Sequence, residues 1–255
     1  MNSRKIPVSK LVDGNRLVTT DIIASETLIK LSFNGQNIAN LLASPDDCSY
    51  LLKGHLVSEG YLDLSLSSDD NEIFVDYGGS GEILVKMSSD KKLNFKSKSP
   101  ILTTTSCGAC NKDGLDILLN NLPPVKRFDN FNPEILFNGL ELMKTNQKGF
   151  SMTGGMHCSG LLSSQGELLH YCEDIGRHNS VDKVIGKALG HVELNNTILL
   201  LSGRCGWDIV AKAARCNIGN IASIGACSTM AADCARNLGI RLFCFVKENS
   251  ATIIG

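Results

Sequence analysis

The sequence lacks any apolar run that approaches the ~20 residues needed for a membrane-spanning helix. Residues 1–16 carry charges and a proline where a secretory signal needs an apolar core. We therefore expect a cytoplasmic protein without a membrane partner. The chain also has little net charge, with a formal charge of −1, and this excludes a global attraction to nucleic acid. Any anion site must be local.

Internal repeats and low-complexity tracts are absent too. The chain has 255 residues, of which 43% are hydrophobic and 20% charged, so it can bury a sizeable core. Residues 91–110 are polar and 120–133 are rich in turn residues. We place a domain boundary in this region, which predicts an N-terminal α+β domain at 1–125 and an α/β domain at 126–255.

The first half is typical of β-structure. Apolar residues alternate with polar ones in 26–33, and Asn34-Gly35 is a strong hairpin turn. Residues 72–75 and 82–87 predict a second hairpin. Between the two hairpins, one apolar face predicts a helix that starts near Pro45 and closes at Gly60.

The second half has a different periodicity. A helix is expected from Asn132 to about Gln147, then a hairpin around Gln165-Gly166 and a helix that ends at Gly190. An alternation of strand, helix, strand, helix and strand follows at 197–201, 207–216, 221–224, 228–238 and 240–246. Short apolar strands alternating with helices predict a parallel sheet that is covered on both faces.

The carboxyl ends of these last strands carry glycine and positive charge. They are residues 202–204, 225–228 and 247–250, and they include Arg204 and Lys247. Ligands of open parallel sheets bind at this edge, where glycines and helix N-termini suit phosphate. The pattern indicates a nucleotide or another phosphorylated ligand. It fits plain turn glycines and a solvated Arg204 equally well.

Two further polar groups have two interpretations each. Residues 173–178 combine both charge signs with an imidazole, which is typical either of a site or of a structural ion-pair junction. The residues alone favour the junction. His157 is either a satisfied polar residue at a strand edge or an acid or base, and the residues alone favour the former.

Five of the ten cysteines lie in apolar or small-residue segments. A reduced thiol there acts as a small core residue, which argues against a disulfide framework. We expect this role for Cys205, Cys216, Cys227, Cys234 and Cys244.

Cys107 and Cys110 form the one closely spaced pair, in a polar, glycine-containing stretch. A structural zinc site needs a second ligand pair, which the sequence lacks. A redox dithiol normally sits at a strand-to-helix junction. A persulfide carrier needs an exposed, mobile thiolate, which the polar stretch before Cys107 favours. Spacing alone leaves redox and sulfur-carrier chemistry open.

Five segments of the chain, taken in order, resemble the FdhD family, the sulfur carriers required for formate dehydrogenase activity. They are TTTSCGAC, SMTGGMHCSG, YCEDIGRHNSVDKVIG, LSGRCGWDIVAKAA and GIRLFCFVKENSATI. The EDIGRHNSVDKVIG block is the most specific element when it is taken together with the cysteine pair, because a chain rarely combines this block with such a pair elsewhere. The resemblance covers nearly the whole chain.

The resemblance implies a cytidine-deaminase-like three-layer α/β domain with a smaller N-terminal α+β domain. It implies a sulfurtransferase in which Cys107 carries the persulfide and Cys110 assists. The sulfur would come from a cysteine desulfurase and pass to the bis-molybdopterin guanine dinucleotide cofactor of formate dehydrogenase, with a homodimer as a candidate assembly. The implied cofactor contacts, with Arg204 from the strand-end argument, are Val246, Lys247, Glu248, Asn249, Ser250 and Ala251.

Two other hypotheses compete with sulfur transfer. A zinc-dependent nucleoside deaminase of the same fold needs H-x-E and P-C-x-x-C motifs. Here Cys158-Ser159 follows His157 and Ser106 precedes the cysteine pair, so we expect no metal. The other hypothesis is a non-catalytic, nucleotide-binding chaperone of a metalloenzyme, in which the cysteines are incidental.

Overall fold

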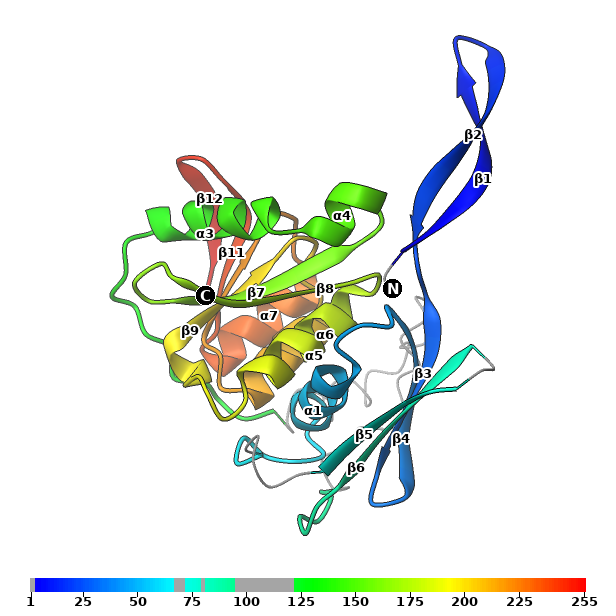
Figure 1. Cartoon of the computed structure of the whole chain (residues 1–255). Helices are drawn as coiled ribbons and strands as arrows, with labels where there is room; N and C mark the ends of the chain where they lie inside the picture. Colours follow the sequence, from blue (N-terminus) through cyan, green and yellow to red (C-terminus); the bar gives the residue numbers. More distant parts are fainter. Residues whose placement is uncertain (1–2, 67–71, 79–80, 95–121) are drawn as a thin grey trace.

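Two β-sheets and a protruding β-ribbon organise the chain (Figure 1). The computed structural model describes residues 3–66, 72–78, 81–94 and 122–255. An N-terminal part built on a four-stranded sheet packs through one helix against a C-terminal part built on a six-stranded sheet (Figure 1). No helix in the described ranges is long and apolar enough to cross a membrane.

The ribbon consists of β1 (Ser3–Val12) and β2 (Asn15–Ala24), which pair antiparallel and extend away from the body (Figure 1). Asp13 and Gly14 make its turn, both with positive φ. The sequence analysis did not predict this hairpin. Its side chains are largely exposed on both faces, so the alternation of buried and exposed residues that marks other strands is weak here.

The four-stranded sheet confirms the two hairpins predicted for the first half. Its strand order is β4-β3-β6-β5, with β3 at Thr27–Phe33, β4 at Gln36–Ala43, β5 at Glu72–Tyr77 and β6 at Glu82–Ser88. The predicted Asn34-Gly35 turn joins the first pair. Helix α1 (Cys48–Ser58) contacts this sheet, and the predicted apolar face of the helix is buried.

The six-stranded sheet has the order β12-β11-β10-β9-β7-β8. Its strands are β7 His157–Ser163, β8 Leu168–Asp174, β9 Thr197–Leu201, β10 Asn220–Ser223, β11 Arg241–Lys247 and β12 Ser250–Ile254. The expected parallel pairing is confirmed for β9, β10 and β11. The hairpin expected around Gln165-Gly166 is confirmed as the antiparallel pair of β7 and β8. The sheet is mixed, because β7 also pairs antiparallel with β9, and β12 with β11.

Helices cover both faces of this sheet and make three layers (Figure 1). The helices are α3 Glu134–Thr145, α4 Lys148–Thr153, α5 Arg177–Ala188, α6 Trp207–Arg215 and α7 Thr229–Leu238. Successive side chains of a strand point to opposite faces of the sheet. Leu162 and Leu200 belong to the core beneath α3, whereas Leu161 and Leu199 belong to the core shared with α5, α6 and α7.

The N-terminal and C-terminal parts of the molecule meet where α1 crosses α5, and each helix has a glycine at the crossing. A Cβ placed on Gly54 would lie 1.7 Å from the carbonyl oxygen of Asp182, and one placed on Gly186 would lie 2.0 Å from that of Tyr50. The backbones of the two helices therefore touch. The domain boundary at 125/126 stays a prediction, and the Val125 amide already donates to the carbonyl of Leu238 in α7.

Candidate functional site

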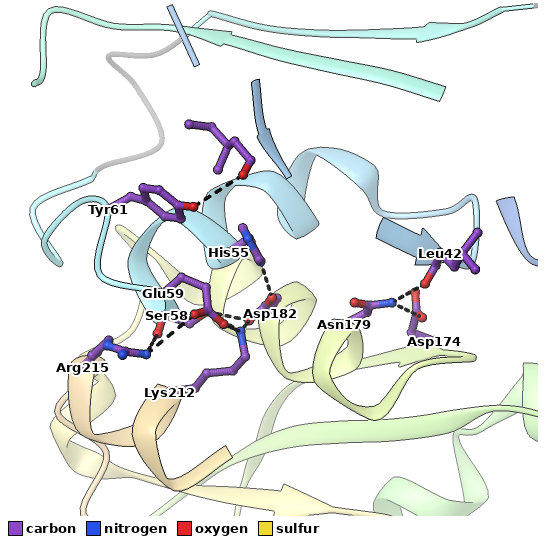
Figure 2. A network of polar contacts seen from close by, with 11 residues as sticks. Leu42, His55, Ser58, Glu59, Tyr61, Asp174, Asn179, Asp182, Lys212 and Arg215 are labelled. Atoms are coloured by element: carbon purple, nitrogen blue, oxygen red, sulfur yellow. Dashed lines mark hydrogen bonds and ion pairs between the residues drawn. The ribbon is translucent and has the colours of Figure 1, made fainter. Parts of the chain in front are cut away.

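A buried polar network joins α1 to α5 and α6 behind the sheet (Figure 2). The Asp182 carboxylate contacts His55 Nδ1 at 3.0 Å, accepts a hydrogen bond from the Ser58 hydroxyl at 2.6 Å and pairs with Lys212 Nζ at 2.7 Å. Lys212 also pairs with Glu59 at 2.6 Å. Burial alone would raise the pKa of Asp182, but Lys212 and His55 outweigh burial and lower it.

A second buried network connects the N-terminal part to the edge of the sheet. Asp174, at the end of β8, accepts hydrogen bonds from the Ser44, Gly176 and Asn179 nitrogens at 2.8–3.0 Å. Lys183 pairs with the same carboxylate at 2.6 Å, and both side chains are fully buried. Asp174 therefore acts structurally, as the ion-pair-junction interpretation of this segment expects.

Glu173 is also occupied by structural contacts. Its two carboxylate oxygens accept hydrogen bonds from the backbone N–H groups of Gly149 and Phe150, both at 2.8 Å, in the first turn of α4. A carboxylate at this place satisfies amide groups that have no partner within the helix. Glu173, a residue of β8, thus holds the start of α4 against β8 through these hydrogen bonds.

The Glu173→Gln substitution tests this anchor. A neutral amide keeps one oxygen acceptor and loses the charge, so the start of α4 should open more easily, by about 1–2 kcal/mol. Hydrogen exchange should become faster at Gly149 and Phe150 and stay unchanged in the sheet. Unchanged exchange at both amides would contradict the assigned role.

Three basic side chains near the end of β8 lack the hydrogen-bond and ion-pair partners that Glu173 and Asp174 have among the described residues. His157 begins β7, Arg177 begins α5, and Arg204 follows β9. None of them makes a hydrogen bond or ion pair through its side chain with a described residue. His157 is partly buried, and both interpretations of it stay predictions. Arg204 stands at the strand end where the sequence analysis expects it.

Charges of both signs act on the His157 ring, and the Asp174 carboxylate opposes the positive ones. Partial burial, together with the positive charges of Arg177, His178 and Arg204, lowers its pKa. Gly203 lies against the ring, because a Cβ there would approach Nδ1 to 3.1 Å. His178 is paired differently: its Nε2 contacts the carboxylate of Asp208 in the first turn of α6.

The six residues predicted to contact a cofactor lie together on one hairpin. Val246 and Lys247 end β11, Glu248 and Asn249 form the turn, and Ser250 and Ala251 begin β12. The prediction that β11 is the last strand is wrong, so this stretch is a tight hairpin instead of a terminal loop. All six line a cavity of about 400 Å³ between the hairpin and α3. Arg204 is not among its lining residues.

A second cavity, of about 440 Å³, lies where α3 and α4 approach the carboxyl ends of β9 and β10. Its wall is largely apolar and includes Met143, Phe150 and Ile224. His157 and Ser202 provide polar groups in its lining. The His157 imidazole therefore lines a cavity large enough for a small molecule.

The cysteines of the described ranges confirm the expected core thiols with one difference. Cys205, Cys216, Cys234 and Cys244 are free and buried. Burial raises the pKa of the Cys244 thiol to about 12, which keeps it protonated. Cys227 is only half-buried, because it lies in the loop between β10 and α7.

Cys107 and Cys110 lie outside the described residues, so their roles stay predictions. Within the described ranges, no group of three or more His, Cys, Asp or Glu side chains is arranged to hold a metal ion.

Comparisons with known proteins agree along nearly the whole chain. The FdhD/NarQ family pattern matches residues 24–254. The chain belongs to the FdhD/NarQ family. A sulfur carrier protein FdhD from Sulfolobus acidocaldarius is 32% identical over 99% of this chain and 96% of its own length. The protein of that name from Streptomyces avermitilis is 31% identical over 96% of this chain and 91% of its own length.

A solved structure has the same fold as this chain. A crystal structure from Desulfotalea psychrophila, whose name assigns it to the formate dehydrogenase accessory proteins, superimposes with a TM-score of 0.76. The two chains are 23% identical, and the match covers 99% of this chain and 96% of the other. The predicted α/β class is thereby confirmed, whereas the cytidine-deaminase-like description stays a prediction.

Sequence reasoning missed part of this edge. It singled out Arg204, favoured an ion-pair junction over a site for the segment 173–178 that contains Arg177, and favoured a satisfied polar residue over an acid or base for His157. The available signal was the position of each residue beside a strand end or helix start. The antiparallel pairing of β7 with β8 and β9 then brings these starts and ends to one edge.

Proposed function

We propose that this protein is a sulfur carrier whose Cys107 accepts a persulfide sulfur and delivers it to a nucleotide-containing acceptor. The observation that carries the proposal is membership of the FdhD/NarQ family over residues 24–254, a range that includes the Cys107–Cys110 pair. Relatives matched over nearly their full length are named sulfur carrier proteins. The donor is a cysteine desulfurase, and the enzyme served is formate dehydrogenase.

The transfer needs no external oxidant or reductant. The Cys107 thiolate attacks the terminal sulfur of the donor persulfide, a Cys107–sulfur bond forms, and the donor cysteine leaves as a thiolate. In delivery, the acceptor supplies the electron pair of the new bond to sulfur. The sulfur–sulfur bond on Cys107 breaks, and its electron pair returns to the Cys107 thiolate. Cys110 assists as the neighbouring thiol.

The proposed acceptor is the bis-molybdopterin guanine dinucleotide cofactor, held as a substrate. The cavity lined by Val246, Lys247, Glu248, Asn249, Ser250 and Ala251 supports this choice. Backbone groups of a tight hairpin turn and the Lys247 ammonium are suited to a nucleotide. A homodimer is the proposed assembly.

Mass spectrometry tests the sulfur site. After incubation with a cysteine desulfurase and cysteine, the peptide that contains Cys107 should gain the mass of one sulfur atom, and reductant should remove it. Cys107→Ala should abolish this adduct. Cys227→Ala is the matched control, since it removes the half-buried thiol of the described ranges and should leave loading intact. A sulfur adduct that persists in Cys107→Ala would overturn the assignment.

A further inference from the structure

Two neighbouring loops beyond the carboxyl ends of β9 and β10 are in backbone contact, and each contains a cysteine. Cys205 follows β9, and Cys227 follows β10. The Cys205 N–H donates to the Ala226 carbonyl at 3.0 Å, and the Ser228 N–H donates to the Cys205 carbonyl at 3.3 Å. These hydrogen bonds form an isolated parallel bridge that pairs Cys205 with Cys227. The two cysteines are therefore register partners.

Further contacts hold the two loops together. The Ser223 hydroxyl donates to the Gly203 carbonyl at 2.5 Å. A Cβ on Gly225 would lie 3.1 Å from the same carbonyl oxygen, so the loop backbones touch there as well. The Phe245 N–H donates to the Gly225 carbonyl at 3.1 Å and ties β11 to the second loop. The separation of the two cysteines is thus set by the sheet and its connections.

This bridge brings Cys205 and Cys227 within reach of a disulfide. Neighbouring strands lie about 4.8 Å apart, and a disulfide joins Cα atoms that are about 4.4–6.8 Å apart. Register partners also direct their side chains to the same face of the pair. The Cβ atoms of a disulfide are about 3.8 Å apart, so closure requires a shift of about 1 Å. Loops beyond the strand ends can supply such a shift.

The two thiols differ in access to solvent, and this sets the order in which they react. Cys205 is 1% exposed, and burial raises its pKa, so it stays protonated and shielded. Cys244, a third thiol that contacts the Cys227 side chain, is 2% exposed, and burial raises its pKa to about 12. Cys227 is half-buried. A dissolved reagent therefore reaches Cys227 first.

We propose that Cys205 and Cys227 form a dithiol that low-molecular-weight disulfides, such as oxidised glutathione, convert to an intramolecular disulfide. Cys227 loses its proton, and its thiolate attacks one glutathione sulfur while the other glutathione leaves as a thiolate. Cys205 then loses its proton and attacks the Cys227 sulfur, which is held beside it, and the second glutathione leaves. The protein loses two electrons and two protons, and the two glutathione molecules receive them.

This dithiol lies beyond the proposed sulfur transfer, which assigns no step to Cys205 or Cys227. Cys107→Ala should therefore form the same disulfide as wild type. Failure of the disulfide with intact sulfur loading of Cys107 removes only this inference. Failed loading with an intact disulfide removes only the sulfur-carrier proposal.

Peptide mapping of the full chain tests the proposal. The protein is incubated with oxidised glutathione, its remaining thiols are alkylated, and the chain is digested with trypsin. Cleavage leaves Cys205 in residues 205–212, Cys227 in 216–236 and Cys244 in 242–247. We expect a disulfide between peptides 205–212 and 216–236, with fragmentation assigning it to Cys227. Dithiothreitol should remove it.

Two variants locate the disulfide. Cys227→Ser should abolish the cross-link. Cys234→Ala is the matched control, because it removes a buried thiol from the same peptide and should leave the cross-link in place. A cross-link from 216–236 to 242–247 would assign Cys244 as the partner and overturn the pair. Glutathione that stays on Cys227, or a Cys227 that does not react, would overturn it as well.

Thermal unfolding provides a second measurement. The disulfide closes a loop from Cys205 to Cys227 and restricts the unfolded chain, so oxidised wild type should melt about 5 °C above the reduced protein. Cys227→Ser should lose this difference, and Cys234→Ala should keep it. An equal shift in wild type and Cys227→Ser would contradict the proposal.

Discussion

Replacing Gly54 by alanine should destabilise the protein by about 3 kcal/mol or prevent folding, because the new methyl group would meet backbone atoms and not a movable side chain. The Cβ would lie 1.7 Å from the Asp182 carbonyl oxygen and 2.9 Å from the Gly186 nitrogen. Relief requires α1 and α5 to separate. Gly186→Ala, whose Cβ would lie 2.0 Å from the Tyr50 carbonyl oxygen, should have the same effect from the other helix.

Thermal and urea unfolding measure this effect, with soluble yield as the readout when a variant does not fold. Gly155→Ala is the matched control, since the nearest atom to its Cβ would be the Ala24 Cβ at 3.4 Å, an ordinary contact. Its unfolding free energy should stay within about 0.5 kcal/mol of wild type. A Gly54→Ala protein as stable as this control would show that the helices are not in backbone contact.

Lys212→Met should destabilise the protein by about 3–5 kcal/mol, because it leaves the Asp182 carboxylate buried without its cation. The side chains of Lys212 and Asp182 are 4% and 2% exposed, so water cannot replace the lost partner. Restoring neutrality with Asp182→Asn in the same chain should recover much of the loss. Urea unfolding of both variants measures the difference. Lys144→Met is the control, as its ion pair with Glu141 is exposed and should matter little.

The same pair gives stability a defined pH dependence. The pKa of Asp182 is lower in the folded protein than in the unfolded chain, so its contribution is complete above the unfolded value of about 4 and is lost as pH falls below it. Lys212→Met should remove this loss at acid pH. A variant that keeps the wild-type acid dependence would contradict the assignment of the effect to this pair.

Both predictions concern the joint between the two parts of the molecule, and this joint supports the candidate site. α1 packs on α5, and the first residue of α5 is Arg177. The Leu42 carbonyl accepts a hydrogen bond from the Asn179 side chain (Figure 2). The Ser44 amide donates to Asp174, which lies opposite His157 in the pairing of β7 with β8. The N-terminal part therefore helps to hold the edge of the C-terminal sheet in place.

The local sequence pattern was sufficient to predict a helix or strand wherever that element buries one face of its side chains. The Asn34-Gly35 hairpin, the apolar face of α1 and the alternation from β9 to β11 could all be predicted. The ribbon of β1 and β2 could not, because neither face is buried. β12 was missed because a two-residue turn after β11 looks like a strand end.

Residue types and their order alone determined the family, the α/β class, the cysteine pair as the proposed sulfur site and the strand-end arginine. Only the tertiary structure decided which charges are used and which remain free. Glu173, Asp174 and Arg177 lie within a few residues of one another. The two carboxylates bind α4 and Lys183, whereas the Arg177 side chain has no hydrogen-bond or ion-pair partner in the part of the chain that the structure describes. The physical reason is that pairing depends on distance in space, and those partners come from segments that meet only after the sheet and its helices have packed.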